Sequence, residues 1–290
     1  MHSESALGPE TEVARSRGGR AVDGATLPTR RVFGFDFISS PTIEAVAELV
    51  LGPQPDDDRL PLVLTPNVDY LVRLDQPANA ALADRLRHSR YVLPDGQPIV
   101  WTSRFSGGAP LAARLPGSSL FPPLWKRIAA ERRPTVVVAS TEETAERLRL
   151  EHPDIGVVVP PFFSEHDADA LAAVLRDCRD QIDKVEPEFV FVGISFPKQQ
   201  LISLALIDQL ESEGRRPPIF LTLGASFEMY LGLQRRAPRV FQRLGLEWLF
   251  RFLLEPRRLF RRYFVTDARF ALLFLRQLRT GRHAPGPDAA

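Results

Sequence analysis

Residues 135–159 read TVVVASTEETAERLRLEHPDIGVVV and contain a complete strand–helix–strand pattern. The apolar runs at 135–139 and 155–159 have the length and the β-branched composition of buried strands. Ser140, with Glu143 three positions later, forms a capping-box pattern that predicts the start of a helix between them. Because these strands are apolar almost throughout, we expect a parallel sheet that is covered on both faces.

The same alternation extends outward in both directions. The other predicted strands lie at residues 32–37, 60–65, 91–93, 189–193 and 219–223. The other predicted helices lie at residues 42–51, from about 68, and at 78–87, 118–132, 167–182 and 197–210. Strands that alternate with helices in this way predict an α/β fold, here a Rossmann-like parallel sheet flanked by helices.

Composition divides the chain into three parts. Residues 1–30 are rich in Gly, Ser, Glu, Arg and Ala without periodicity, which predicts a disordered leader. Residues 31–230 carry the alternating pattern and form the predicted α/β core. Residues 231–290 form a C-terminal appendage with thirteen Arg, no Lys and four acidic residues, a net charge of +9 in a chain whose total is +1.

The appendage combines its positive charge with large apolar side chains. Residues 245–262 read GLEWLFRFLLEPRRLFRR. Arg binds phosphate through paired N–H donors, and aromatic side chains suit the boundary between lipid and water. We therefore predict a helical basic appendage that associates with a membrane surface. A packed helix pair with a solvated basic face is the alternative structure, and RNA is the alternative partner, although no RNP, KH or helix-turn-helix signature is present.

Several function classes lack their sequence signatures. A single cysteine, Cys178, excludes a disulfide framework and a cysteine-based metal site. No apolar run approaches the roughly 20 residues that span a bilayer, and the first residues lack the apolar region of a secretory signal. The patterns GxGxxG, GxxxxGK[ST], HExxH and GxSxG are absent, which disfavours dinucleotide, P-loop, zinc-protease and serine-hydrolase chemistry.

Polar residues follow the predicted strands, at the sheet edge where ligands bind in parallel sheets. Asp95 follows residues 91–93, and a carboxylate there suits a general base that takes a proton from an attacking hydroxyl. Because Asp95-Gly96 is also a common turn pair, an ordinary turn is the alternative. Thr65 and Asn67 follow another strand and offer a hydroxyl and an amide, which also suit a helix N-cap.

Two further segments place polar groups before predicted helices. Arg114-Leu-Pro-Gly117-Ser118-Ser119 predicts an anion site made by helix N-terminal N–H groups, with Arg114 adding charge, or simple capping by Ser118 or Ser119. The segment from Gly193 to Gln200 runs from a strand through a turn into a helix, and we expect Lys198 and Gln199 near the same edge.

Short segments of this kind occur in a definite order. They are Thr65-Pro-Asn67, Leu93-Pro-Asp95-Gly96, Arg114-Leu-Pro-Gly117-Ser118, Gly193 with Pro197-Lys198-Gln199, Gly224-Ala225-Ser226-Phe227-Glu228, Arg236-Ala237-Pro238 and the block at 245–262. Their order, together with that last block, resembles the WecG/TagA/CpsF glycosyltransferases. The resemblance covers roughly residues 31–275.

The resemblance implies an inverting glycosyltransferase. Such an enzyme moves a sugar from a UDP-sugar donor to a polyprenyl-diphosphate-linked saccharide in cell-surface polysaccharide biosynthesis. By the match, Asp95 would be the general base, and Thr65 and Asn67 would line the catalytic pocket. The implied substrate-binding residues are Gly96, Arg114, Gly117, Ser118, Gly193, Lys198, Gln199 and Gly224. The implied lipid- or diphosphate-binding residues are Arg251, Arg257, Arg258, Arg261 and Arg262.

The resemblance also implies partners and a location. The enzyme would be cytoplasmic and peripheral on the inner face of the plasma membrane, without a cofactor. No DxD pattern follows a predicted strand, so arginines rather than a metal ion are expected to neutralise the leaving diphosphate. Nucleic acid is not an expected partner, and a homo-oligomer is left open. The alternative function is a non-catalytic, membrane-associated adaptor of a polysaccharide assembly complex.

Three positions depart from the family's pattern. Gln97-Pro98 follows Gly96 where Gly-x-Gly is usual, so the second glycine is lost. Gln200 replaces the Glu that ends the family's PKQE, and Glu228 replaces an Asp. These changes bear on the choice of donor sugar more than on the class of reaction.

Overall fold

The computed structural model describes residues 20–22, 25–234 and 269–279. The strands of the main sheet are β3 (Thr29–Val32), β4 (Phe35–Ile38), β5 (Leu60–Leu64), β6 (Ser89–Val92), β7 (Thr135–Val138), β8 (Gly156–Val158), β9 (Phe189–Val192) and β10 (Ile219–Thr222). These eight strands lie in the order β3-β4-β6-β5-β10-β9-β7-β8. Only β3 pairs antiparallel with its neighbour, and all the other pairs in this sheet are parallel.

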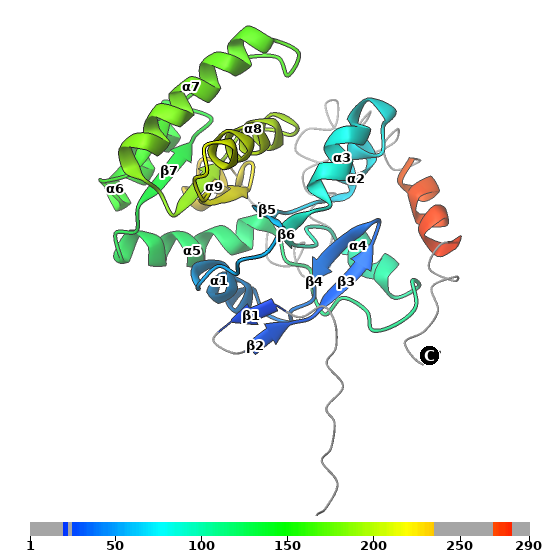
Figure 1. Ribbon diagram of the computed structural model, residues 1–290. Coiled ribbons are helices and arrows are strands. Elements are labelled where there is room, and N and C mark those ends of the chain that lie inside the picture. The colour runs from blue at the N-terminus through cyan, green and yellow to red at the C-terminus, as the bar shows by residue number, and fades with distance from the viewer. Residues whose placement is uncertain (1–19, 23–24, 235–268, 280–290) are drawn as a thin grey trace, which may run out of the picture.

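Helices cover both faces of the sheet, as Figure 1 shows. They are α1 (Ile43–Leu51), α2 (Val68–Leu74), the 3-10 turn η1 (Pro77–Asn79), α3 (Ala80–Leu86), α4 (Gln97–Ser103), α5 (Gly117–Ala130), α6 (Glu142–Glu151), α7 (Ala168–Val185), α8 (Lys198–Ser212) and α9 (Ser226–Tyr230). A further helix spans residues 269–279. The predicted Rossmann-like α/β architecture is therefore confirmed.

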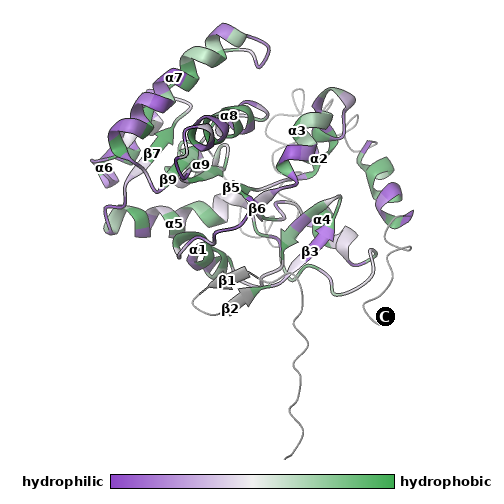
Figure 2. Ribbon diagram, viewed as in Figure 1, coloured by the Kyte–Doolittle hydropathy of each residue, from purple (hydrophilic) through white to green (hydrophobic). Residues whose placement is uncertain are grey.

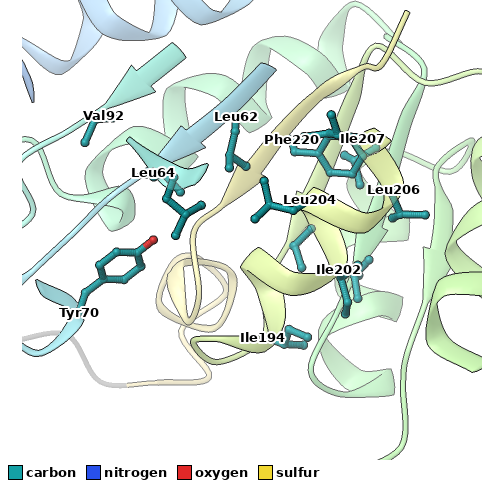
Figure 3. Packing of buried hydrophobic residues seen from close by; sticks show 14 of the residues in the cluster. Leu62, Leu64, Tyr70, Val92, Ile194, Ile202, Leu204, Leu206, Ile207 and Phe220 are labelled. Atoms are coloured by element: carbon teal, nitrogen blue, oxygen red, sulfur yellow. The ribbon is translucent and has the colours of Figure 1, made fainter. Parts of the chain in front are cut away.

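Alternate side chains of each strand enter two different hydrophobic clusters. Leu62 and Leu64 of β5 pack in the cluster that contains α2, α7 and α8, whereas Val63 packs with α1, α5 and α6. Successive strand residues point to opposite faces, so a continuous apolar run supplies both clusters at once. Figure 3 shows Leu62, Leu64 and Leu204 of the first cluster together.

The covering helices are amphipathic. In α7 the buried residues Val174, Cys178 and Ile182 recur every four positions, which places them on one side of the helix. Figure 2 shows the corresponding division of α7 into apolar and polar sides. Burial raises the pKa of the Cys178 thiol to about 12, so this lone cysteine is a packing residue rather than a nucleophile.

The first predicted strand, at residues 32–37, is wrong as a single element. The chain instead turns back on itself between β3 and β4, and Val32 pairs with Phe35. Phe33 and Gly34 both have positive φ, 50° and 78°, which is the backbone requirement of a tight two-residue hairpin turn. The length of the apolar run concealed this turn, because Phe33 is not a residue that signals positive φ.

Ordered structure also begins earlier than the predicted end of the leader at residue 30. Strands β1 (Arg20–Val22) and β2 (Ala25–Leu27) form a separate antiparallel pair. The rest of the predicted leader, residues 1–19 and 23–24, lies outside the described residues.

Part of the predicted appendage forms the helix over residues 269–279, which packs against the opposite end of the core sequence. The Phe33 N–H group donates to Gln277 Oε1 at 2.8 Å, and the Phe33 and Phe270 rings lie 5.6 Å apart. Arg276 forms an ion pair with Asp75 at the end of α2, at 3.1 Å. The helical prediction therefore holds for this segment. No helix in the described parts of the chain is long and apolar enough to cross a bilayer.

The predicted capping box is shifted by one residue. Thr141, and not Ser140, is the N-cap of α6, and its hydroxyl accepts a hydrogen bond from the Thr144 N–H group at 3.2 Å. Thr141 has the extended backbone that an N-cap requires, and Ser140 donates instead to Glu228 of α9.

This cap predicts a difference in stability between two neighbouring alanine variants. Thr141→Ala should lower the free energy of unfolding by about 1 kcal/mol, because it leaves N–H groups at the start of α6 without their acceptor. Ser140→Ala should have a smaller effect, since it removes only a solvent-accessible hydrogen bond. Urea unfolding followed by circular dichroism measures both, and an equal or reversed order would contradict the assigned cap.

Candidate active site

The order of the strands creates a topological switch point at the carboxyl edge of the sheet, between β5 and β10, which we call the crevice. β5 and β10 are neighbours, but β5 continues through α2 and α3 to β6 on one side, while β10 is reached from β9 on the other. In open α/β sheets, ligands bind where the connections separate in this way. The residues that follow β5, β6 and β10 therefore define the candidate site.

Backbone hydrogen bonds join three of the predicted segments beyond the ends of their strands. These bonds run from Leu93 N to Leu64 O (2.9 Å), from Asp95 N to Pro66 O (3.0 Å) and from Leu115 N to Pro94 O (2.8 Å). The segments that carry Thr65, Asp95 and Arg114 are consequently side by side. Asp95 and Arg114 are half-buried, and each takes part in further interactions.

Asn67 and Gly96 belong to the same junction and begin the next two helices. Asn67 is the N-cap of α2, because its Oδ1 accepts from the Tyr70 N–H group at 3.0 Å. Gly96 is the N-cap of α4, and a methyl group placed there would come within 3.8 Å of the Asn67 Cα atom. Asn67 thus has the capping role that the sequence suggested, beside the predicted base.

The N-terminus of α5 enters the crevice between β5 and β10. A methyl group at Gly117 would lie 3.1 Å from Thr65 Oγ1 and 3.3 Å from Ser226 Oγ, so only glycine leaves both hydroxyls their present space. Pro116 is the N-cap residue and makes no side-chain cap. Ser118 therefore lies within the first turn of α5 rather than capping it. The N–H groups at the start of a helix have no intrahelical acceptor, and they attract anions.

Gln199 links α8 to the end of β10. Its side chain is 6% exposed, and its Oε1 atom accepts from the Gly224 N–H group at 3.1 Å. Gly224 has φ of 54°, a conformation that favours glycine. This hydrogen bond holds the backbone next to Ser226, which follows β10. It therefore holds the side of the crevice that lies across β5 from the Asp95 segment.

Two predicted substrate-binding residues make their described contacts elsewhere. A methyl group at Gly193 would lie 2.2 Å from the Phe227 ring, so close packing alone accounts for this glycine. Lys198 Nζ donates to the Phe163 carbonyl at 3.1 Å and lies 5.1 Å from the centre of the exposed Phe162 ring. Lys198 therefore faces the loop after β8. In the sheet, β8 is separated from β6 by four strands, β5, β10, β9 and β7.

Buried polar groups lie behind the site. The Tyr70 ring packs against Phe196, with ring centres 4.6 Å apart, and Figure 3 shows Tyr70 beside Leu64. Burial raises the pKa of the Tyr70 hydroxyl. Gln200 is fully buried, and neither polar atom of its side chain has a hydrogen-bond partner among the described residues.

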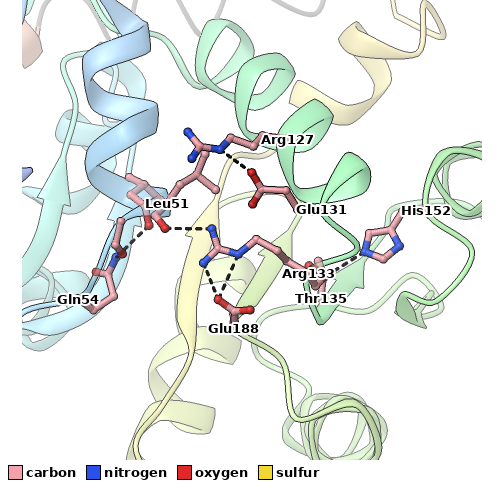
Figure 4. Close-up of polar contacts among 10 residues, drawn as sticks. Leu51, Gln54, Arg127, Glu131, Arg133, Thr135, His152 and Glu188 are labelled. Atoms are coloured by element: carbon pink, nitrogen blue, oxygen red, sulfur yellow. Dashed lines mark hydrogen bonds and ion pairs between the residues drawn. The ribbon is translucent and has the colours of Figure 1, made fainter. Parts of the chain in front are cut away.

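One pocket among the described residues lies at the opposite, amino edge of the sheet. It has a volume of about 670 Å³ and is lined by several arginines and prolines. Its arginines already have partners: Arg90 pairs with Asp57 at 3.0 Å, and Arg133 Nε donates to Glu188 at 3.2 Å. Figure 4 shows Arg133 reaching from Glu188 to the Leu51 carbonyl, 2.9 Å from its Nη1 atom. This network is structural, because its charges are satisfied within the protein.

Two residues of the carboxyl edge, Ser226 and Ser140, have contacts that the sequence did not predict. Ser226 lies in a quoted motif, but only the pairing of β10 with β5 reveals that it meets Gly117. Ser140 was assigned to a cap, yet it contacts Glu228, whose second carboxylate oxygen has no hydrogen-bond partner among the described residues. Arg251, Arg257, Arg258, Arg261 and Arg262 lie outside the described residues. In the described part, no group of three or more His, Cys, Asp or Glu residues is placed to hold a metal ion.

Comparison with known proteins identifies relatives of the chain. Proteins of Staphylococcus aureus strains MRSA252 and NCTC 8325 are both named N-acetylglucosaminyldiphosphoundecaprenol N-acetyl-beta-D-mannosaminyltransferase. Each is 28% identical to this chain over 187 residues, which cover 62% of the chain and 67% of the relative. The model of the glycosyl transferase WecG/TagA/CpsF family matches residues 30–284. Since that match spans nearly all of the 290 residues, the chain belongs to the WecG/TagA/CpsF family and is a glycosyltransferase.

Proposed function

We propose that this glycosyltransferase moves a sugar from a UDP-sugar donor to N-acetylglucosamine linked to a polyprenyl diphosphate, with inversion at the sugar. The product would serve cell-surface polysaccharide biosynthesis. One observation above all supports the proposal: backbone bonds hold the segments of Thr65 and Asp95 side by side, and Gly117 at the start of α5 lies against Thr65. The relatives' names supply the acceptor class. Family membership favours this enzyme over a non-catalytic adaptor.

In the proposed reaction Asp95 is the general base. Its carboxylate takes the proton of an acceptor hydroxyl, and the resulting oxygen nucleophile forms a bond to the anomeric carbon of the donor. The bond between that carbon and the diphosphate oxygen breaks on the opposite face, and UDP leaves with the electron pair. One carboxylate is sufficient, because a single displacement inverts the anomeric centre.

The start of α5 suits the leaving diphosphate. Gly117 and Ser118 present backbone N–H groups at a helix N-terminus, where the helix dipole favours negative charge. Arg114 lies in the loop that is hydrogen-bonded to Pro94, and it would add a full positive charge. These groups would stabilise the charge that develops on UDP as the bond breaks.

The remaining predicted residues have supporting roles in this proposal. Thr65 and Asn67 line the pocket beside Asp95, and Asn67 also orients α2. Gly96, Gln199 and Gly224 shape the backbone around the substrates. Gly193 would contribute only by letting the Phe227 ring pack against it, and Lys198 would hold the loop after β8 rather than touch the substrate.

The acceptor's lipid requires the enzyme to work at a membrane. We propose that it is peripheral on the inner face of the plasma membrane, where Arg251, Arg257, Arg258, Arg261 and Arg262 of the appendage bind lipid phosphate or the acceptor diphosphate. Arg suits this task because its planar group donates two parallel hydrogen bonds to phosphate.

Replacement of the proposed base should abolish most of the activity. Asp95→Asn keeps the size of the side chain but cannot accept the proton, so kcat should fall by about 10²- to 10⁴-fold. Transfer from UDP-N-acetylmannosamine to a short-chain polyprenyl-diphosphate N-acetylglucosamine measures the effect. The melting temperature should change little, which separates loss of chemistry from loss of fold.

Asp154→Asn is the matched control, because Asp154 is exposed, pairs with Arg132 and lies away from the crevice. It should retain wild-type activity. Full activity of Asp95→Asn would show that another group accepts the proton.

The proposed charge stabilisation by N–H groups and arginine predicts activity without a divalent metal. Transfer should continue at an unchanged rate after dialysis against EDTA, because no step depends on a cation to neutralise UDP. Rates measured with and without added Mg²⁺ or Mn²⁺ test this. A loss of activity in EDTA that Mg²⁺ restores would contradict it.

A further inference from the structure

Four of the six large, exposed apolar side chains among the described residues belong to two elements that touch each other. Trp101 and Phe105 are 47% and 61% exposed, and Leu272 and Leu275 are 58% and 50% exposed. The first two belong to α4 and the turn that follows it, and the other two belong to the helix over residues 269–279. The two elements touch, since the Phe105 and Phe274 rings lie 6.1 Å apart in an edge-on contact.

The backbone presents Trp101 and Phe105 on the same side. They are four residues apart, and the hydrogen bond from Phe105 N to Thr102 O continues the helical turn beyond the end of α4. On the other helix, Phe270 and Leu273 are half-buried toward the core, whereas Leu272 and Leu275 are turned outward. We call these four outward side chains, Trp101, Phe105, Leu272 and Leu275, the apolar patch.

The two elements that carry the apolar patch contain arginines and no acidic residue. Residues 96–130 and 268–287 contain no Asp or Glu. Arg104 stands between Trp101 and Phe105 and is exposed, as are Arg269 and Arg279 of the other helix. A second copy of the chain would oppose this charge with the same charge across a two-fold axis, whereas an anionic lipid surface complements both the charge and the apolar groups.

We propose that the apolar patch inserts into the interfacial region of an anionic phospholipid membrane, so that α4 of the catalytic core is itself a membrane contact. The inference rests on the proposed function, which requires a lipid-linked acceptor. α4 begins two residues after Asp95, and the helical rise from Gln97 to Trp101 is about 6 Å. Insertion of α4 would thus hold the proposed base close to the level of the lipid phosphates, where the acceptor diphosphate lies.

The test uses the full chain and vesicles of phosphatidylglycerol and phosphatidylcholine in equal amounts. The double variant Trp101→Ser/Phe105→Ser should partition into these vesicles at least about tenfold more weakly. The reason is that transfer of serine from water to the membrane gains less free energy than transfer of the aromatic side chain it replaces. Leu150→Ser and Phe162→Ser are matched controls, since Leu150 and Phe162 are 83% and 97% exposed but lie outside the apolar patch. Both controls should bind like the wild type.

A fluorescence measurement tests the same contact in a chain with an intact patch. The chain has three tryptophans, Trp101, Trp125 and Trp248, and Trp125 is fully buried. In a Trp248→Phe variant, anionic vesicles should shift the emission to shorter wavelengths, and brominated lipids should quench it. Absence of both effects would overturn the proposal, whatever the fate of the double variant.

The other outcomes are equally decisive. Unchanged vesicle binding by the double variant, or an equal loss in the controls, would overturn the proposal. A change from dimer to monomer in light scattering, with vesicle binding retained, would assign the patch to a second copy instead. Transfer to a water-soluble acceptor separates the two proposals. The double variant should retain this transfer, because it needs no membrane contact. If the wild type does not catalyse this transfer, the result counts against the proposed function and not against the membrane contact.

Discussion

The hydrogen bond from the Asp95 N–H group to the Pro66 carbonyl continues the pairing of β5 with β6 past the ends of both strands. It brings the third residue after β6 against the second residue after β5, and the neighbouring bond from Leu115 to Pro94 adds the loop that carries Arg114. Backbone pairing therefore sets the arrangement of these side chains, and the packing of the sheet holds it rigid. If the proposed site is correct, this backbone pairing would organise it before any substrate arrives, as electrostatic stabilisation of a reaction requires.

The sequence predicted what depends on local pattern. Apolar runs such as 135–138 and 189–192 identified the central strands, since only a strand buried on both faces needs so many consecutive apolar residues. The residues after each strand identified the edge of the site, because carboxyl ends of parallel strands lie together. Local pattern failed at the Phe33-Gly34 turn, where a phenylalanine adopts positive φ, and at the α6 cap, where two adjacent residues were equally good candidates.

What the sequence could not predict depends on strand order. Nothing in residues 219–222 indicates that β10 lies beside β5, yet this pairing brings Ser226 to Gly117 and the Gly224 N–H group to Gln199. The same strand order places the loop that Lys198 contacts, after β8, far from β6, the strand that precedes Asp95. The two edges of the finished sheet also differ in their polar groups. At the amino edge, Arg90 and Arg133 are paired with carboxylates, whereas near the carboxyl edge Gln200 keeps buried polar atoms without partners in the described chain.

The outermost strands of the main sheet have a consequence for assembly. β8 is only three residues long and is followed by Pro160 and Pro161, and β3 is preceded by Pro28 and carries Arg30 and Arg31. Short strands, prolines and charged side chains make a poor template for pairing with the strand of another molecule. These borders therefore resist growth of the sheet from one molecule into the next, which protects the enzyme from edge-to-edge aggregation.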